Sequence, residues 1–221
     1  MKRINWTAII LALALVAFFV GFGKNYGNLI KKADRVPLIS ELKDAPIMGK
    51  EEAKAFIEIY SEFQCPACNK YYVETVKRII DEYIETGKAR LAYRDLFFSE
   101  GRSQWAIEAV YCANDQGKYW ELHDKLLTER YNSQNNEIYE KANLKKTAKE
   151  LGLNENQFND CLDSGKYTKF LSDLKQEYLK KGITGVPTTF LNGKMIADEK
   201  GRSLGAMPYE ALKEKIEALL K

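Results

Sequence analysis

Two cysteines, Cys65 and Cys68, enclose Pro66 and Ala67 in a C-x-x-C motif. The motif stands where a run of β-branched and aromatic residues gives way to an amphipathic segment. This predicts a helix with Cys65 at its N-cap and Pro66 at its first position. Backbone N–H groups and the macrodipole at a helix N-terminus favour the thiolate, and a second thiol three residues on can resolve a disulfide. The motif therefore predicts dithiol–disulfide exchange.

Two other readings of this pair stay open. A static structural disulfide would add little stability, because closing so short a loop removes little entropy from the unfolded chain. Half of a zinc site would need a second closely spaced pair, but the other two cysteines, Cys112 and Cys161, lie far apart in the chain. We expect no metal at the motif.

Cys112 and Cys161 fall on two predicted helices, and we expect a structural disulfide between them. Closing a loop of that size contributes roughly 4 kcal/mol in the chain-entropy model. Two buried free thiols and a second redox relay are the alternatives.

The elements around the motif form a strand–helix–strand unit. Residues 55–61 are a short apolar run that predicts a buried strand, and residues 88–96 alternate as a second strand. Gly87 suits the end of the helix between them. Strand, helix and strand at this length predict parallel pairing. The apolar stripe of this helix consists of Tyr72, Val73, Val76, Ile79, Ile80, Tyr83 and Ile84.

The pattern is then wholly helical over about residues 99–182, with stripes centred on 105–113, 119–127, 144–151, 158–162 and 170–179. Strand patterns return at 186–191 and 194–196. Asn192-Gly193 between them is a strong hairpin signal. A last helix is predicted over 209–220.

The N-terminal segment is of a different kind. Ile4–Gly23 is an uncharged, mainly apolar run preceded by Lys2 and Arg3, and it is long enough to span a bilayer. We expect residues 1–23 to be an uncleaved signal anchor rather than a cleaved signal peptide, because Gly21-Phe22-Gly23 is a poor cleavage site. Residues 24–44 read as a tether, and residues 45–221 as one domain.

Charge excludes one class of partner. The chain of 221 residues has a net charge of +3, with lysines and glutamates interleaved and no dense basic stripe. We therefore expect no nucleic-acid partner. Basic residues flank both ends of the apolar run, so charge alone does not orient it. The thiols favour the oxidising side of a membrane, and we expect the domain to be extracytoplasmic.

The order of elements is that of an α/β, thioredoxin-like fold with a helical insertion, and the sequence resembles the DsbA-like thiol:disulfide oxidoreductases of bacterial envelopes. The resemblance spans roughly residues 44–220 in the family's order and spacing. The stretches that carry it are Glu62–Cys68 (EFQCPAC), Tyr111–Trp120 (YCANDQGKYW), Asp160–Lys166 (DCLDSGK) and Gly185–Gly193 (GVPTTFLNG).

The resemblance implies roles for the matching residues. It implies that Cys65 is the exposed nucleophile and Cys68 the buried resolving thiol, with their redox-active disulfide in place of any external cofactor. Pro187 matches the cis-proline that faces this disulfide, and Val186 the backbone edge that holds a substrate peptide.

Two positions depart from the family's pattern. Ala67 stands where many members have a histidine between the cysteines, and Ile59 where related folds often hold a buried acid. The redox potential is therefore not carried over by the resemblance. Of two further candidates, we expect His123 to be structural or on the surface, and Glu62 to be a loop carboxylate rather than a group that tunes the thiolate.

The sequence thus predicts a protein thiol:disulfide oxidoreductase, favoured as an oxidase, that exchanges disulfides with reduced or unfolded secreted polypeptides. Recycling would need a membrane redox partner. A reductase or isomerase of the same fold is the first alternative, and a non-redox metal-binding or chaperone module is the second. The expected location is the cell membrane through one span, or a secreted or periplasmic protein if residues 1–23 are removed.

Overall fold

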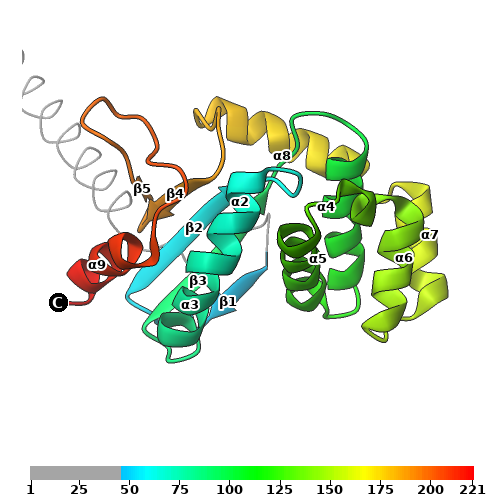
Figure 1. Cartoon of the computed structure of the whole chain (residues 1–221), viewed down its shortest axis with the longest axis horizontal. Helices are drawn as coiled ribbons and strands as arrows, with labels where there is room; N and C mark the ends of the chain where they lie inside the picture. The colour runs from blue at the N-terminus through cyan, green and yellow to red at the C-terminus, as the bar shows by residue number, and fades with distance from the viewer. Residues whose placement is uncertain (1–45) are drawn as a thin grey trace, which may run out of the picture. The chain divides into compact units, whose positions relative to one another are not determined.

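The computed structural model describes residues 46–221, which contain a five-stranded sheet in the order β1-β3-β2-β4-β5 (Figure 1). Strands β2 and β3 are parallel, whereas the other neighbours are antiparallel. The parallel pairing agrees with the prediction; β1, at the edge of the sheet, was not predicted. The strands are β1 (Ile47–Gly49), β2 (Ala55–Ser61), β3 (Ala89–Asp95), β4 (Thr188–Leu191) and β5 (Lys194–Met195).

A continuous run of helical turns connects β2 to β3, as its apolar stripe predicts. Two of its turns are π-helical, a wider winding that the spacing of the apolar residues did not reveal. Gly87 follows the last turn with a φ of 75°, and its conformation suits the reversal into β3. The segments are α2 (Pro66–Tyr71), η2 (Tyr72–Val76), α3 (Lys77–Ile79) and η3 (Ile80–Ile84).

All five helices predicted between β3 and β4 are present, with one additional 3₁₀ turn. Figure 1 shows α4 to α7 grouped beside the sheet and α8 running across its upper end. The elements are α4 (Arg102–Asn114), α5 (Tyr119–Ser133), η4 (Asn136–Tyr139), α6 (Lys141–Glu150), α7 (Glu155–Ser164) and α8 (Thr168–Lys180).

The chain ends in a hairpin and a helix, as predicted. Asn192 and Gly193 have φ values of 47° and 77°, the left-handed pair that a tight hairpin turn requires between β4 and β5. Helix α9 (Tyr209–Leu220) then packs on the same face of the sheet as η2, through the buried side chains of Leu212 and Ile216.

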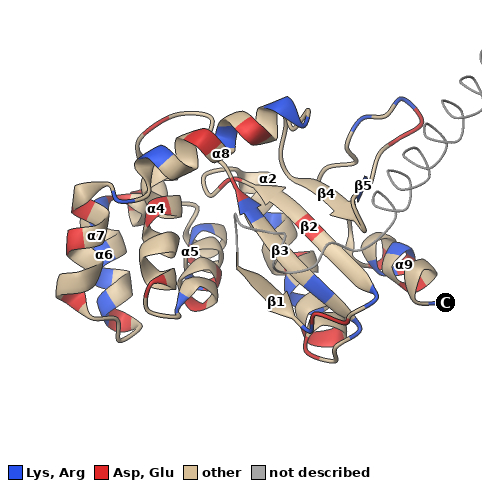
Figure 2. Ribbon diagram, turned by 180° about the vertical axis from the view of Figure 1, so that it is seen from behind, with Lys and Arg blue, Asp and Glu red and all other residues tan. Residues whose placement is uncertain are grey.

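The sheet separates two apolar clusters. The larger lies on the face covered by α2–η3 and α9, and it continues into the helical block. The smaller lies under α8, where Tyr60 of β2 packs edge-on against Tyr178 with ring centroids 4.9 Å apart. Figure 2 shows this second face, with α8 crossing its upper end.

The predicted anchor (1–23) and tether (24–44) lie outside the described residues. Within residues 46–221, none of the helices combines the length and apolar character needed to cross a bilayer.

Candidate active site

Cys65 and Cys68 stand at the start of α2, directly after the carboxyl end of β2. Cys65 is the N-cap of the helix, with extended backbone angles, and Pro66 occupies the first turn. The Sγ atom of Cys65 accepts the backbone N–H of Cys68 at 3.4 Å. Cys65 is half-buried and Cys68 fully buried, and both are free thiols in the structure. The geometry therefore presents one thiol to an approaching partner and keeps the other behind it.

The loop before β4 brings a second element to this site. The peptide bond between Val186 and Pro187 is cis. The Cys65 thiol lies 3.9 Å from the carbonyl oxygen of Val186. Residues 121 positions apart in the sequence therefore meet at Cys65, where the resemblance implies a nucleophile beside a substrate-binding edge.

The pKa values of the two thiols are shifted in opposite directions. A hydrogen bond from the Cys68 thiol lowers the pKa of Cys65 to about 7, while burial and the nearby carboxylate of Glu62 act in the other direction. Burial raises the pKa of Cys68 far above its ordinary value. The site therefore stabilises a thiolate at Cys65 and a protonated thiol at Cys68 near neutral pH.

Glu62, which the sequence predicts to be an ordinary loop carboxylate that does not tune the thiolate, is instead buried at this site, and its charge raises the pKa of Cys65. Its Oε1 accepts the backbone N–H of Gln64 at 3.0 Å and the hydroxyl of Ser103, which lies on α4. Burial raises the pKa of Glu62. The carboxyl group thus links the active-site loop to the first helix of the insertion.

The carbonyl oxygen of Phe63 holds the same loop from the other side. It accepts the side-chain amide of Asn69 at 2.9 Å and the hydroxyl of Tyr139 at 2.8 Å. Both donors are buried. The conformation of the C-x-x-C loop is therefore set by the helical block as well as by the sheet.

His123, which was expected to be structural or exposed, is completely buried beside the active-site segment. Its Nε2 lies 3.3 Å from the carboxylate oxygens of Asp95, and its ring packs against Phe63. Asp95 also accepts the hydroxyl of Tyr119 at 2.8 Å. Sequence reasoning did not single out Asp95. The available signal was its place at the end of a predicted strand parallel to β2, because such ends meet at one edge of a sheet.

The two departures from the family's pattern stand where the sequence placed them. Ala67 is exposed on the first turn of α2, whereas Ile59 is buried on β2 within the main apolar cluster. Neither supplies an ionisable group to the thiols.

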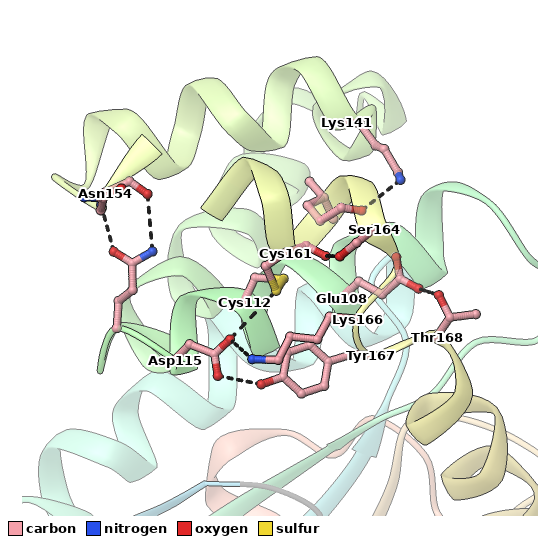
Figure 3. The surroundings of a disulfide bond; sticks show 12 residues. Glu108, Cys112, Asp115, Lys141, Asn154, Cys161, Ser164, Lys166, Tyr167 and Thr168 are labelled. Atoms are coloured by element: carbon pink, nitrogen blue, oxygen red, sulfur yellow. Dashed lines mark hydrogen bonds and ion pairs between the residues drawn. A yellow bond between two sulfur atoms is a disulfide. The ribbon is translucent and has the colours of Figure 1, made fainter. Parts of the chain in front are cut away.

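Cys112 of α4 and Cys161 of α7 form a disulfide with their Cα atoms 5.8 Å apart (Figure 3). Asp115 lies beside it, bound to Lys166 at 2.7 Å and to the hydroxyl of Tyr167 at 2.6 Å. Because these two cysteines bond to each other, they do not provide the second thiol pair that a zinc site at the motif would need.

Comparison with known proteins agrees with this architecture. The family model described as Thioredoxin matches residues 41–218. The probable disulfide bond formation protein D of Bacillus anthracis is 25% identical over 178 residues, which cover 79% of this chain and 77% of that protein.

Two solved structures are similar in fold. BdbD from Bacillus subtilis, in its oxidised form, has a TM-score of 0.67 at 20% identity, over 81% of this chain and 94% of that one. The α-DsbA1 protein of Wolbachia pipientis has a TM-score of 0.69 at 21% identity, over 84% and 93% of the two chains. The expected thioredoxin-like α/β fold with added helices is therefore confirmed for the described residues.

Proposed function

The chain belongs to the thioredoxin family, and we propose that it oxidises protein thiols through a redox-active Cys65–Cys68 pair. The resemblance to DsbA-like proteins is confirmed by the family model and by relatives named for disulfide bond formation. The chain is thus an enzyme of the thiol:disulfide oxidoreductase class, and its direction, substrates and location are the subject of the proposal.

The reaction begins with the Cys65–Cys68 disulfide. A substrate thiolate attacks Sγ of Cys65, the bond between the two enzyme sulfurs breaks, and Cys68 leaves with the electron pair and takes up a proton. A second substrate thiolate then attacks the substrate sulfur of the mixed disulfide, and Cys65 leaves as a thiolate. The substrate has lost two electrons to the enzyme, which is now a dithiol.

The observation that carries the proposal is the placement of Cys65 at the N-cap of α2, opposite Val186. The exposed sulfur is the one an incoming thiolate reaches, and the Val186–Pro187 backbone beside it offers an edge for an extended peptide. Pro66 and Ala67, both exposed, form the outer turn of the site. The redox-active disulfide itself is the only redox group this reaction uses.

The lowered pKa of Cys65 favours oxidation of substrate thiols by the enzyme. A pKa of about 7 makes Cys65 a good leaving group from the mixed disulfide. It also stabilises the reduced enzyme, and a stabilised reduced form makes the disulfide form a stronger oxidant.

Location and recycling follow from the same chemistry. We propose that the domain works outside the cytoplasm, tethered by residues 1–23, because a C-x-x-C oxidase needs an oxidising compartment. Its substrates would be reduced or unfolded secreted polypeptides, and a membrane redox partner would return it to the disulfide form. Protease added to intact protoplasts should digest residues 46–221, and their protection would contradict this location. The mass of the mature protein shows whether residues 1–23 are removed.

The direction is tested by the redox equilibrium of the full-length protein with glutathione, quantified by trapping free thiols. We expect a potential well above that of cytosolic reductants, and catalysed oxidation of a reduced polypeptide that Cys65→Ser abolishes. A strongly reducing potential would replace the oxidase with a reductase or isomerase of the same fold. Full biological activity of Cys65→Ser would instead favour a non-redox binding module.

A further inference from the structure

A cluster of polar side chains lies behind Cys68 at the carboxyl end of the sheet. Ser61 and Asp95 are paired across the parallel strands β2 and β3, and Tyr93 lies two residues before Asp95 on the same face. Cys68, on the first turn of the helix that covers this face, lies near the side chains of Ser61 and Tyr93.

Asp95 and His123 form the inner end of this cluster. Both are buried, and Nε2 of His123 is 3.3 Å from the Asp95 carboxylate. The hydroxyl of Tyr119 binds the second carboxylate oxygen. Asp95 is therefore placed to hold the Nε2–H of the imidazole and to stabilise an imidazolium.

Three buried polar atoms of this cluster have no hydrogen-bond partner within the part of the chain that the structure describes. They are Oγ of Ser61, the hydroxyl of Tyr93 and Nδ1 of His123. The rings of Tyr93 and His123 are in contact, with centroids 4.5 Å apart. An imidazole whose Nε2–H donates to Asp95 has a free lone pair on Nδ1, which can accept a proton. Unpaired buried groups of this kind are rare, and they often mark functional sites.

The buried thiol of Cys68 needs a nearby group that can accept its proton. Its thiol is buried, so it cannot exchange its proton directly with solvent, and burial strongly disfavours its thiolate. The position that could have held a buried acid is occupied by Ile59. Oε1 of Glu62 accepts the hydroxyl of Ser103 and the backbone N–H of Gln64.

We propose that the Asp95–His123 pair is the proton store for Cys68, reached through the hydroxyls of Tyr93 and Ser61. The proposal rests on the proposed function, because it concerns the same two thiols. When Cys68 attacks Cys65 in a mixed disulfide, the new sulfur–sulfur bond forms and the substrate leaves as a thiolate. The Cys68 proton passes to the imidazole, and Asp95 holds the resulting imidazolium. In the oxidising direction, the leaving Cys68 thiolate takes the proton back.

Other ionisable groups surround the pair. Tyr72 and Tyr119 face His123 from η2 and α5, and burial raises the pKa of both phenols. Glu62 and Tyr139 lie on the insertion side, and each has an electrostatic interaction with Asp95. The tyrosines therefore stay protonated near pH 7. Nδ1 of His123 has a lone pair that no group of the described residues occupies, and it is the acceptor we assign.

The kinetic test uses the full-length protein with glutathione bound to Cys65 as a mixed disulfide, from which Cys68 expels glutathione. We expect His123→Gln to slow this release about 100-fold at pH 7, as for loss of a general base. Its rate should then rise about tenfold per pH unit, since only hydroxide remains to take the proton, whereas the wild-type rate reaches a plateau. The rate at which Cys65 is alkylated should differ less than twofold between His123→Gln and the wild type. A parallel pH profile for wild type and variant would overturn the proposal.

A matched pair of tyrosine variants separates the relay from general packing. Tyr93→Phe removes the unpaired phenol hydroxyl of the cluster. Tyr83→Phe removes the hydroxyl of another buried tyrosine, which donates to Glu217 at the far end of the helix. We expect only Tyr93→Phe to slow glutathione release. Equal rates for both variants would contradict the relay.

A measurement on the unaltered protein guards against variants that fail to fold. His123 is the single histidine of the chain, so its imidazole nitrogens can be followed by NMR without assignment. We expect its titration curve to differ between the Cys65–Cys68 disulfide and the protein alkylated at Cys65, because coupled groups share their protonation equilibria. Identical curves would overturn the proposal. Failure of the proposed function is seen separately, as wild-type protein that exchanges no disulfides.

Discussion

Sγ of Cys65 accepts both hydrogen bonds that Cys68 offers: the backbone N–H at 3.4 Å and the thiol. The buried cysteine therefore stabilises the thiolate of the exposed one before any redox chemistry takes place. Since the thiol bond is the largest cause of the lowered pKa of Cys65, the acidity of the exposed thiol depends on the buried one.

Replacing Cys68 should consequently change the acidity of Cys65. Cys68→Ala removes the side-chain donor, and we expect the titration midpoint of Cys65 to rise from about 7 toward the ordinary thiol value. Cys68→Ser keeps a donor at this position and should retain most of the effect. The thiolate absorbance near 240 nm measures both. Equal midpoints for the two variants would show that the helix N-terminus, and not Cys68, sets the acidity.

The same shift makes the stability of the reduced protein depend on pH. The pKa of Cys65 is lowered from 9.0 to about 7 on folding, so the unfolded chain binds more protons between these values. Stability should therefore rise as the pH increases from about 7 to 9, and it is lost again as the pH falls through about 7. Burial of Cys68 acts in the opposite sense only above the ordinary thiol pKa. Guanidinium unfolding of protein in which Cys65 and Cys68 are reduced while the Cys112–Cys161 disulfide is intact measures the trend, and Cys65→Ser should abolish it.

Glu62→Gln tests the carboxylate that interacts electrostatically with the Cys65 thiol. Its charge opposes formation of the Cys65 thiolate, so we expect the amide to lower the midpoint of Cys65 by a few tenths of a unit, roughly 0.5 kcal/mol. The amide oxygen introduced by this substitution can still accept the Ser103 and Gln64 donors, which keeps the loop in place. Glu121→Gln, an exposed residue paired with Lys118, is the control and should leave the midpoint unchanged. A rise in the midpoint after Glu62→Gln would contradict this role.

Most of the fold could be predicted from periodicity, and the site could be predicted in part. Period-2 and helical patterns gave all the long elements, and Asn192-Gly193 gave the hairpin. The edge strand β1 was missed because three residues are too few to establish a period. Cys65 and Val186 were related only through the resemblance, because local patterns carry no information on contacts 121 residues apart.

The contact between the buried side chains of Asp95 and His123 could not be predicted from local sequence patterns. Each residue stands in an otherwise ordinary segment, one at a strand end and one on an amphipathic helix. Their meeting depends on how the helical block docks on the sheet, which no local pattern encodes. The position of Asp95 at the end of a strand parallel to β2 was a signal available in advance.

The disulfide between Cys112 and Cys161 should stabilise the insertion without taking part in exchange. It closes a loop with a sequence separation of 49, for which the chain-entropy model gives about 4 kcal/mol. We expect Cys112→Ala/Cys161→Ala to lower the free energy of unfolding by about 2–4 kcal/mol, measured with denaturant, while the oxidation rate of a reduced peptide changes less than twofold. Loss of activity in a folded double variant would instead favour a second redox relay.

The carbonyl oxygen of Phe63 accepts hydrogen bonds from both Asn69 and Tyr139. Tyr139→Phe removes one donor but leaves the carbonyl bonded, so we expect a loss of only about 1 kcal/mol in the free energy of unfolding. Removing both donors, with Asn69→Ala added, leaves a buried carbonyl without a partner, and the combined loss should exceed the sum of the single losses by about 1–2 kcal/mol.

The control for this pair is Tyr131→Phe, whose exposed hydroxyl binds Glu74 and should matter by less than about 0.5 kcal/mol. Denaturant unfolding of the four variants and the wild type completes the cycle. Because Phe63 lies two residues before Cys65, the double variant should also slow disulfide exchange, since the nucleophile loses its fixed position. Strict additivity in stability would mean that the two donors hold the loop independently, and that the carbonyl is not their common anchor.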